Sequence, residues 1–370
     1  MSDDSPNRRA ARKDDHLRLA LQQRAEAKQR NEFDDLEFVH HALAAADVTD
    51  VSLDVNVGQW TWPVPFYVNA MTGGTDLTDR INREIAVAAR ETGLPMACGS
   101  VSVGLDDAAA ARGFAAIRTE NPDGFVMANL GIGRSADDAS RAVDLLRADA
   151  LQVHVNAVQE TAMPEGTRDF SGWLASLEGI VATSQVPVIV KEVGFGLSRR
   201  TLVRLADMGV SLADVSGRGG TDFLRIENDR TAAGDFSMLA GFGQSALACL
   251  LDAPSGGPQL LASGGVRNPF DVAKALAAGA SAVGVAAVFL EVVAAGGAEA
   301  LVPLLRTWKR QLVALLRLLG ASDATGLLST DILVRGRLRE FCELRGVDAQ
   351  ALARRSEQAQ APSPVPRRMS

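Results

Sequence analysis

Four side chains that can do chemistry lie close together in the segment His154-Val-Asn-Ala-Val-Gln-Glu160. His154 can serve as a base or as a phosphate ligand, and Asn156 and Gln159 bring two amides. Glu160 is the only hard oxygen ligand of the group, and a lone carboxylate often holds Mg²⁺ together with substrate phosphates. A single histidine is more often a structural residue, but its place in this cluster favours a binding or catalytic site.

Two glycine-containing segments later in the chain, Ser263-Gly-Gly-Val-Arg267 and Gly284-Val-Ala-Ala287, are suited to an anion. Glycines let backbone N–H groups approach a phosphate closely, and Arg267 adds positive charge. A helix that begins near Pro269 would direct the positive end of its dipole to the same place. We therefore expect a phosphate here, although either segment alone is also explained as a turn that needs glycine.

Two other segments bring polar groups that suit a ligand. Ser216-Gly-Arg-Gly-Gly-Thr221 combines two hydroxyls with three glycines and an arginine, which fits a polar ligand edge or a tight turn. Lys191 ends an apolar run and can present a cation to an electron-rich cofactor. A buried ion pair with Glu192 is the alternative for this lysine.

Met71-Thr-Gly-Gly74 would bring backbone close to a flat ring, with Thr72 as a hydrogen-bond donor. Ser100 and Asn129 extend the same set of donors. Together with the phosphate segments and Lys191, these groups describe a site for flavin mononucleotide (FMN). No G-x-G-x-x-G motif follows a predicted strand, so a Rossmann dinucleotide domain is not indicated.

These residues lie at the ends of eight short apolar runs that we interpret as strands. The runs are nearly continuous in apolar residues, as expected of parallel strands buried on both faces. The predicted strands are Val64–Ala70, Leu94–Ser100, Gly124–Leu130, Ala150–Asn156, Pro187–Val193, Leu212–Ser216, Gln259–Ser263 and Ala282–Ala286. Helical stretches between them include Thr78–Thr92, Ala136–Ala148, Ser198–Met208 and Pro269–Ala278.

Eight such units predict an α/β protein with a (β/α)8 TIM barrel rather than an open doubly wound sheet. In that barrel the active site forms where the strands end and the loops begin. The polar strand ends described above would therefore meet at one mouth. We expect residues 13–345 to form a single FMN-binding domain of this kind.

The chain also extends beyond the barrel at both ends. Residues 1–12 are polar and basic and predict a flexible arm, and residues 355–370 are rich in Pro and Ser and predict a disordered tail. We expect C-terminal helices after the barrel. One of them, Val302–Leu319, places an apolar stripe that would pack on the barrel or on a neighbouring subunit.

Between the arm and the first barrel strand, Phe33–Ala46 is expected to form a short helix. The segments Ser52–Val55 and Gln59–Trp62 are expected to form a strand pair that closes the bottom of the barrel.

Composition narrows the class of protein. The 370 residues are 47% hydrophobic, enough for a large core, and the net charge of −7 argues against a general binder of nucleic acid or membrane surfaces. Cys98, Cys249 and Cys342 are too few and too scattered for a disulfide framework, which favours a reducing compartment. The charged N-terminus and the lack of a long uninterrupted apolar run favour a cytoplasmic location over export or membrane insertion.

Jointly, five motifs resemble the FMN-dependent type 2 isopentenyl diphosphate isomerases. The resemblance extends from Arg12 to about Gly336, and the joint match is specific although each motif alone is weak. The motifs are Arg-Lys-Asp-Asp-His at 12–16, Met-Thr-Gly-Gly at 71–74, His-Val-Asn-Ala-Val-Gln-Glu at 154–160, Lys-Glu-Val-Gly-Phe-Gly at 191–196 and Ser-Gly-Arg-Gly-Gly-Thr at 216–221. By composition alone the first of these would be a solvated arm.

The resemblance implies interconversion of isopentenyl and dimethylallyl diphosphate with Mg²⁺ and with FMN that NADPH reduces, in a homo-oligomer. It implies that Gln159 is the catalytic residue and that Glu160 binds Mg²⁺. The implied substrate-binding residues are Arg12, Lys13, His16, His154, Asn156 and Gln159. The implied FMN-binding residues are Met71, Thr72, Gly73, Ser100, Asn129, Lys191, Ser216, Thr221, Gly265, Val266, Arg267, Ala286 and Ala287.

Isomerisation of an unactivated alkene needs protonation at one carbon and deprotonation at another, with the cationic transition state shielded from water. No side chain in the sequence is an obvious strong acid beside an apolar pocket. The resemblance therefore suggests the reduced flavin as the main acid and base, with Gln159 as a relay.

Two departures from the family pattern concern the loops. Val101 and Ser102 follow Gly99-Ser100 where many members have Gln followed by Arg or Met, so diphosphate contacts from this loop do not transfer. Gly241-Phe-Gly-Gln-Ser-Ala246 stands where members usually carry a Trp-Gly pair.

Three other functions share some of these features. An FMN barrel that oxidises α-hydroxy acids needs a histidine base near the later strands, and the sequence has no histidine after His154. A barrel like IMP dehydrogenase needs a nucleophilic cysteine in a loop where none of the three cysteines lies. A flavin or diphosphate sensor would leave Gln159 and Glu160 unexplained.

Overall fold

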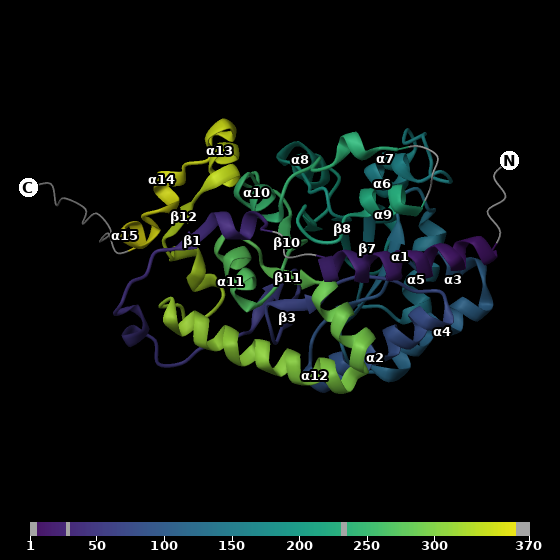
Figure 1. Cartoon of the computed structure of the whole chain (residues 1–370), viewed down its shortest axis with the longest axis horizontal. Helices are drawn as coiled ribbons and strands as arrows, with labels where there is room; N and C mark the ends of the chain where they lie inside the picture. Colours follow the sequence, from purple (N-terminus) through teal and green to yellow (C-terminus); the bar gives the residue numbers. More distant parts are fainter. Residues whose placement is uncertain (1–5, 27–29, 231–234, 360–370) are drawn as a thin grey trace, which may run out of the picture.

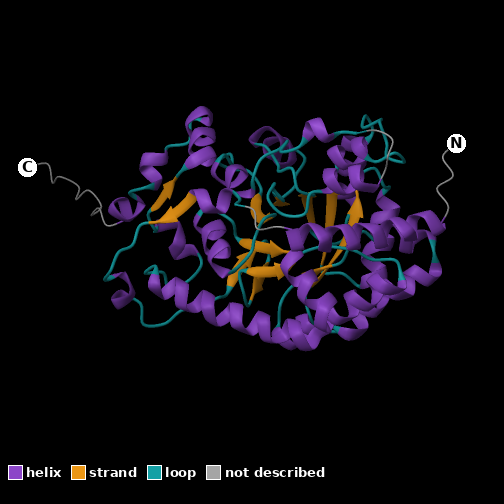
Figure 2. Cartoon of the chain, in the orientation of Figure 1, coloured by secondary structure: helices purple, strands orange, loops and turns teal. Residues whose placement is uncertain are grey.

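The computed structural model describes residues 6–26, 30–230 and 235–359. Eight parallel strands form a closed barrel surrounded by helices, which confirms the predicted fold class (Figure 2). Each barrel strand overlaps its predicted apolar run. The strands are β4 (Phe66–Val68), β5 (Met96–Ala97), β6 (Val126–Gly131), β7 (Ala150–Val155), β8 (Val188–Glu192), β9 (Leu212–Asp214), β10 (Gln259–Ser263) and β11 (Ala282–Val285).

The barrel closes where β11 pairs in parallel with β4. Its strands are buried on both faces, because one face packs inside the barrel and the other against the helices. Phe66, Tyr67 and Val68 of β4, for example, are all 0% exposed. This double burial explains why the strands are recognisable as continuous apolar runs.

The helices of the barrel lie between these strands, and several begin at a cap residue that the sequence makes visible. The side-chain oxygens of Ser135, Ser198 and Asn268 accept backbone N–H groups of the first helical turn. The helices are α2 (Asp76–Thr92), α3 (Ser102–Asp106), α4 (Ala108–Glu120), α5 (Ala136–Leu146), α6 (Ala157–Ala162), α7 (Trp173–Thr183), α8 (Arg199–Asp207), α9 (Phe223–Arg230), α10 (Ala246–Leu251) and α11 (Pro269–Ala277). A 3-10 turn, η3 (Ser237–Leu239), precedes α10.

The short helix predicted over Phe33–Ala46 is wrong. This segment forms the 3-10 turn η1 (Glu32–Asp35), the strand β1 (Leu36–Phe38) and a second turn, η2 (Ala44–Asp47). β1 pairs antiparallel with β12 (Ile332–Val334), about 300 residues later in the chain. Backbone pairing and the complete burial of Leu36 at this distant strand override the local helical pattern.

A strand pair at the bottom of the barrel is present as β2 (Val55–Val57) and β3 (Trp60–Trp62), but β2 begins at Val55, where the predicted strand Ser52–Val55 ends. The N–H of Gly58 donates to the side-chain oxygen of Gln259, the first residue of β10, at 2.7 Å. The hairpin therefore covers the end of the barrel where the strands begin, opposite the candidate active site.

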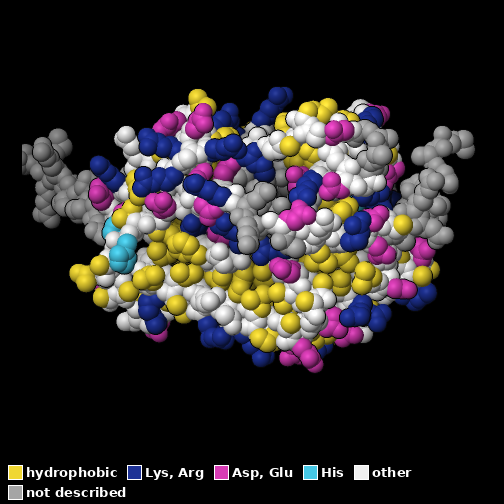
Figure 3. Space-filling view, viewed as in Figure 1, with side chains coloured by type: hydrophobic (Ala, Val, Ile, Leu, Met, Phe, Trp, Pro, Cys, Tyr) yellow, Lys and Arg dark blue, Asp and Glu magenta, His cyan; other side chains and the backbone are white. Residues whose placement is uncertain are grey.

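The long helix α12 (Ala287–Leu318) carries the predicted apolar stripe after a kink at Gly296 and Gly297. Leu305, Trp308 and Leu312 of that stripe are buried in the protein. α12 also has the length and apolar composition of a membrane span, which is weak evidence because buried core helices share both properties. Figure 3 shows hydrophobic side chains gathered in a band along α12 on this face of the molecule.

The C-terminal segment returns to the barrel. It comprises η4 (Thr325–Ser329), β12, α13 (Gly336–Arg345), α14 (Ala349–Leu352) and α15 (Arg355–Ala359). The predicted disordered tail is therefore wrong for residues 355–359, because Arg355 donates to the carbonyls of Thr330 and Ala277 and fixes the segment. Residues 360–370 of that prediction lie outside the described residues.

At the N-terminus, the first part of the predicted flexible arm, residues 1–5, also lies outside the described residues. From Pro6 the arm is instead part of the helix α1 (Pro6–Glu26). Proline is well suited to a first helical position because it has no N–H to leave unpaired there.

Helix α1 lies in front of the barrel (Figure 1) and is fastened along its length. The hydroxyl of Thr75, after β4, donates to Asp14 at 2.6 Å. Gln23 exchanges two hydrogen bonds with the backbone of Asp222, which precedes α9. α1 therefore brings its own side chains to the mouth of the barrel.

Candidate active site

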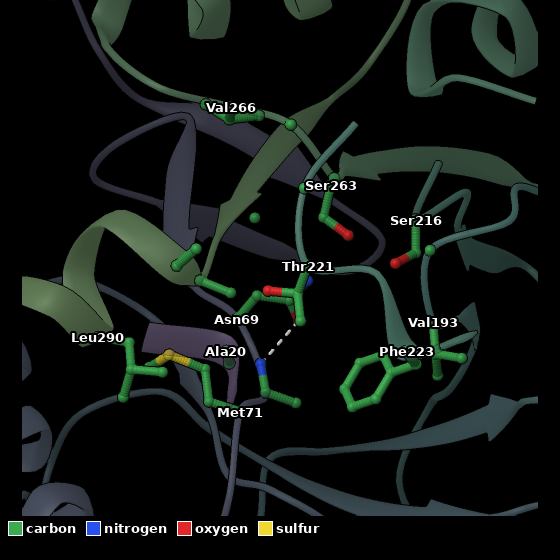
Figure 4. A pocket seen from close by; sticks show the side chains of 18 of the residues that line it. Ala20, Asn69, Met71, Val193, Ser216, Thr221, Phe223, Ser263, Val266 and Leu290 are labelled. Carbon is green, nitrogen blue, oxygen red and sulfur yellow. Dashed lines mark hydrogen bonds between the residues drawn. The ribbon is translucent and has the colours of Figure 1, made fainter. Parts of the chain in front are cut away.

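Two adjoining cavities lie at the carboxyl-terminal ends of the barrel strands. The glycine-rich cavity, shown in Figure 4, is lined by α1, by the segment after β4 and by the loops that follow β9, β10 and β11. The cationic cavity is lined by α1 and by residues that follow β5, β6 and β7. The two cavities share a wall formed by His16, Ala70, Met71, Thr72, Lys191, Val193 and Phe223.

Glycine is required where the loops of the glycine-rich cavity meet. Gly264 has a φ of 95°, and a Cβ atom on it would lie 1.9 Å from the carbonyl oxygen of Gly217. A Cβ atom on Gly220 would lie 2.8 Å from the backbone nitrogen of Gly265. Only glycine allows these two loops to pack directly on each other, which leaves backbone rather than side chains at this part of the wall.

The segment Asn31–Asp35 fastens the same two loops from outside. The Asn31 amide donates to the carbonyl of Gly265 at 2.8 Å and to that of Gly219 at 3.5 Å. Arg267 makes a bidentate pair with Asp34, at 3.0 and 2.7 Å. Its Nε also donates to Asp271 at 2.8 Å.

These carboxylates hold the pKa of Arg267 above its usual value, with Asp271 as the larger influence. The predicted phosphate ligand Arg267 lines the cavity, but its charge is already balanced by two carboxylates. The sequence could not reveal this pairing, because Asp34 lies more than 200 residues earlier in the chain.

Lys191 is buried in the wall between the cavities. Its ammonium group donates to the backbone carbonyl of Glu192 at 2.8 Å and to the hydroxyl of Ser216 at 3.2 Å. The Glu192 carboxylate instead accepts backbone N–H groups from the loop that follows it, including those of Val193 and Gly194 at 2.6 and 2.7 Å. The alternative of a structural Lys191–Glu192 side-chain pair is therefore wrong.

Thr72 is the clearest unsatisfied polar group in the shared wall. Its hydroxyl is buried and has no hydrogen-bond partner among the described residues. A buried hydroxyl without a partner is unfavourable, so this group is suited to a ligand in either cavity.

The cationic cavity is lined by six basic residues, Arg12, Lys13, His16, Arg134, His154 and Lys191. Arg12 and Lys13 reach it from α1, and His154 from the end of β7. Burial lowers the pKa of Lys13 to about 8, and the side chain has no hydrogen bond or ion pair to any described residue. Arg12 pairs with Glu165 at 3.3 Å.

His154 is neutral in this arrangement. Burial, together with the charges of Lys191 and Lys13, lowers the pKa of His154 to about 3. Its Nδ1 lies 2.7 Å from the side-chain oxygen of Asn129, whose amide nitrogen donates to Gln152 at 3.0 Å. Because that oxygen can only accept, Nδ1 carries the proton of the neutral ring.

Gln159 belongs to a buried polar chain that sequence reasoning did not find. Its amide donates to Glu227 at 2.9 Å, and His16 of α1 lies 3.0 Å from the same carboxylate oxygen. Burial alone would raise the pKa of Glu227, but the hydrogen bond from His16 and the charge of Arg230 lower it overall. Glu227, which sequence reasoning did not place at the site, is thus a completely buried carboxylate beside Gln159.

Glu160 lies next to this chain in the cationic cavity. Its carboxylate accepts from the Asn156 amide at 3.0 Å and from the N–H of Thr167 at 2.9 Å. No cluster of three or more His, Cys, Asp or Glu that could hold a metal occurs in the described part of the chain. Glu160 would therefore need substrate and water to complete a Mg²⁺ site.

The structure brings nearly all the sequence-predicted site residues to the two cavities. All the predicted substrate-binding residues, together with Glu160, Ser100 and Asn129, line the cationic cavity. The other predicted FMN residues line the glycine-rich cavity except Gly73, which lines neither. Gly73 packs against Phe114, where a Cβ atom would lie 2.4 Å from the ring.

Val101 and Ser102, which depart from the family pattern after Ser100, lie in different environments. Ser102 lines the cationic cavity and lies 3.1 Å from the Ser100 hydroxyl, whereas Val101 is 0% exposed in the core. Only Ser102 is therefore available to a ligand.

Comparisons with known proteins agree with this geometry. A family model described as FMN-dependent dehydrogenase matches residues 138–334, more than half of the chain. The isopentenyl-diphosphate delta-isomerase of Kitasatospora griseola is 56% identical over 350 residues, covering 95% of this chain and 96% of that protein. The protein of the same name from Streptomyces sp. (strain CL190) is 53% identical over 352 residues, covering 95% and 97%.

Solved structures with the same fold are more distant in sequence. A mandelate oxidase with (S)-2-phenylpropionate has a TM-score of 0.60 at 20% identity, covering 86% of this chain and 90% of that one. A flavocytochrome b2 mutant with benzoylformate has a TM-score of 0.60 at 20% identity, covering 80% and 75%. At this identity the likeness concerns the barrel fold alone.

Proposed function

Because the chain belongs to the FMN-dependent, type 2 family of isopentenyl-diphosphate delta-isomerases, we propose that it interconverts isopentenyl and dimethylallyl diphosphate with FMN, Mg²⁺ and NADPH. The observation that carries the proposal is the shared wall between the glycine-rich and cationic cavities. A cofactor in one and a diphosphate in the other would face each other across Met71, Thr72 and Lys191.

FMN fits the glycine-rich cavity on three observations. The interlocked glycine loops leave room for a phosphate, the unpartnered Thr72 hydroxyl is available to the ring, and the buried Lys191 supplies a cation. When bound and reduced, FMN would supply acid and base groups for moving protons. Reduction would come from NADPH, whose hydride the flavin accepts.

The diphosphate of the substrate would bind in the cationic cavity. Arg12 and Lys13 would contribute charge to its oxygens, because both line the cavity and Lys13 has no other partner in the described part of the chain. His154 would join them only with an extra proton on Nε2, which a nearby anion favours. Glu160 would hold Mg²⁺ against the same phosphates.

Helix α1 would exclude water from the hydrocarbon part of the substrate. His16, Leu17 and Ala20 of α1 line the glycine-rich cavity opposite the barrel, so the helix covers its mouth. A cationic transition state in such a covered site would not be trapped by water.

Gln159, His16 and Glu227 would hold and orient protons beside the reacting carbons. Gln159 lines the cationic cavity with both ends of its amide held: the nitrogen donates to Glu227, and the oxygen accepts from the Asn156 amide at 3.4 Å. Burial lowers the pKa of His16, and the buried carboxylate of Glu227 opposes that shift by favouring the protonated ring. These three residues would thus position a proton donor and disperse positive charge.

The direct experiment is an isomerase assay of the purified chain with isopentenyl diphosphate, FMN, NADPH and Mg²⁺. We expect yellow protein that loses its colour when NADPH is added without oxygen, and dimethylallyl diphosphate as the product. Protein that takes up no FMN, or that is inactive when fully loaded, would contradict the proposal. Full activity with 5-deaza-FMN would exclude the flavin as the main acid and base.

The role of Glu160 has its own variant. Glu160→Gln should lower kcat/KM by roughly 100-fold and raise the Mg²⁺ concentration needed for half-maximal rate. Glu178→Gln, at an exposed position of α7, is the control and should behave like the wild type.

We also propose a cytoplasmic homo-oligomer, with the apolar band along α12 as the contact, which light scattering would test.

A further inference from the structure

One carboxylate inside the barrel lies beneath the glycine-rich cavity. Asp214, the last residue of β9, is 0% exposed. The interior of a (β/α)8 barrel is usually filled with branched apolar side chains, and burying a charge is unfavourable unless it is well paired. A charge at this position therefore requires an explanation.

Asp214 accepts hydrogen bonds from the end of β4, from the end of β10 and from the segment that follows its own strand. Oδ2 accepts from the Tyr67 hydroxyl at 2.8 Å and from the Asn69 amide at 3.1 Å. The Ser263 hydroxyl lies 2.9 Å from both carboxylate oxygens, and Oδ1 accepts the backbone N–H of Ser216 at 3.0 Å. The carboxylate thus joins the ends of β4, β9 and β10.

Three of these four partners are themselves part of the cavity wall. Asn69, Ser216 and Ser263 line the glycine-rich cavity, and Figure 4 shows their side chains around it. Asp214 does not line the cavity. It acts on the cavity through the groups that it holds.

Asp214 also bears on the charge of Lys191. The two residues are register partners on the adjacent strands β8 and β9, and the Ser216 hydroxyl accepts from the Lys191 ammonium. No ion pair within 4.0 Å joins Lys191 to any described carboxylate. Burial lowers the pKa of Lys191, whereas Asp214 and Glu192 raise it.

We propose that Asp214 is a positioning residue for the flavin: it fixes Asn69, Ser216 and Ser263 in the cavity wall and supplies the counter-charge of Lys191. This inference rests on the proposed FMN site and specifies how the barrel interior prepares it. A protonated Lys191 in the wall favours the reduced flavin, which carries more negative charge than the oxidised form.

The test compares Asp214→Asn with the wild type in two measurements of FMN itself. The affinity for FMN, followed by quenching of flavin fluorescence, should fall about tenfold or more, because several hydrogen bonds lose their charged acceptor. The midpoint potential of bound FMN should become more negative, because Lys191 loses its counter-charge and is then more often neutral.

Two control variants separate this role from general stability. Asp331→Asn removes another buried carboxylate, which pairs with His41 and Ser356 outside both cavities, and should change neither affinity nor potential. Tyr67→Phe removes one hydrogen bond without changing charge, so the potential should stay at the wild-type value.

A further variant, Ser263→Ala, replaces Asp214→Asn in the test if Asp214→Asn does not fold. It removes one hydrogen bond of the network and should weaken FMN binding about threefold or more.

The outcomes are distinct. Wild-type affinity and potential in Asp214→Asn, or in Ser263→Ala where only that variant folds, overturn the inference, even if the thermal unfolding temperature falls. A more positive potential shows that Lys191 keeps its charge without Asp214 and also overturns it. Wild-type protein that binds no FMN contradicts the proposed function instead, which the same titration reveals in a separate sample.

Discussion

Arg267 in the glycine-rich cavity and Lys13 in the cationic cavity have their positive charges balanced in opposite ways. In the glycine-rich cavity, Arg267 is paired with both Asp34 and Asp271 before any ligand arrives. In the cationic cavity, Lys13 has no partner among the described residues, and burial lowers its pKa to about 8.

This difference matches the ligands that we propose. A cofactor that stays bound gains little from a strained, unpaired cation, and a prebuilt frame of paired charges holds its loops in place. A substrate that must bind and leave gains from cations whose partner is the substrate itself, because its arrival relieves their unfavourable burial. The charge of Arg267 is therefore balanced by the protein itself, and that of Lys13 is left for the substrate to balance.

The largest effect on activity should come from removing the unpaired cation, Lys13. Lys13→Met should lower kcat/KM for isopentenyl diphosphate about 100-fold or more, because a buried charged contact to phosphate is lost. FMN affinity should not change. Arg18→Met, on the exposed face of the same helix, is the control. An equal loss of FMN affinity in Lys13→Met would show that the two cavities are not separate in charge.

The same variant should be more stable than the wild type when no ligand is present. A lysine whose pKa is lowered on folding opposes folding below that pKa, and the penalty disappears only as the pH rises above about 8 toward the unfolded value. At pH 7, Lys13→Met should therefore gain about 1 kcal/mol, allowing for partial exposure. Pyrophosphate should raise the unfolding temperature of the wild type more than that of the variant.

Removing the paired cation, Arg267, should instead affect FMN binding and stability and leave substrate binding unchanged. Arg267→Gln should weaken FMN binding about tenfold and lower the free energy of unfolding by about 2 kcal/mol, because the buried Asp271 loses its partner. In FMN-saturated enzyme the KM for isopentenyl diphosphate should stay constant. Arg335→Gln, which breaks an exposed pair with Glu37 at 3.4 Å, should change little. A raised KM without a loss of FMN affinity would contradict this division.

The binding of substrate and the binding of FMN should also differ in their dependence on pH. Lys13 is charged below its pKa of about 8, so substrate binding is strong below that pH and is lost as the pH rises through it. Between pH 7 and pH 9 the KM of the wild type should rise about tenfold, and that of Lys13→Met should not. FMN affinity should not follow the titration of Lys13, because Lys13 does not line the glycine-rich cavity. A flat KM profile in the wild type would mean that Lys13 does not contact the diphosphate.

Sequence reasoning found the barrel because its physical basis is local. Strands buried on both faces give continuous apolar runs, and the barrel geometry then locates the site at their ends. His154, Gln159 and Lys191 were therefore identified from position alone. His154 and Lys191 lie near the ends of β7 and β8, and Gln159 lies in α6, the helix that directly follows β7.

Glu227, Asp34 and β1 were missed because their roles depend on distant partners. Glu227 lies within a helix and gains its importance from His16, about 210 residues earlier. Asp34 is an ordinary acidic residue until Arg267 is placed beside it. β1 forms only because β12 is available to pair with it. Patterns within a short window cannot reveal such contacts.

The smallest predicted effect concerns Asn31, which fastens the two glycine loops to each other. Its amide donates to the carbonyls of Gly265 and Gly219, and its side-chain oxygen also caps η1 by accepting from Phe33. Asn31→Asp keeps a good cap but removes the amide donor, so it separates the two roles. FMN affinity should fall about threefold to tenfold, as for the loss of one or two hydrogen bonds.

A second substitution completes that test. Asn31→Ala removes both the cap and the donor, so it should bind FMN as weakly as Asn31→Asp and in addition unfold at a lower temperature. If only Asn31→Ala weakened FMN binding, the contribution of Asn31 would be its cap. Affinity reduced equally in both variants, with an unchanged KM for isopentenyl diphosphate, would show that the frame of the glycine-rich cavity is set independently of the charges in the cationic cavity.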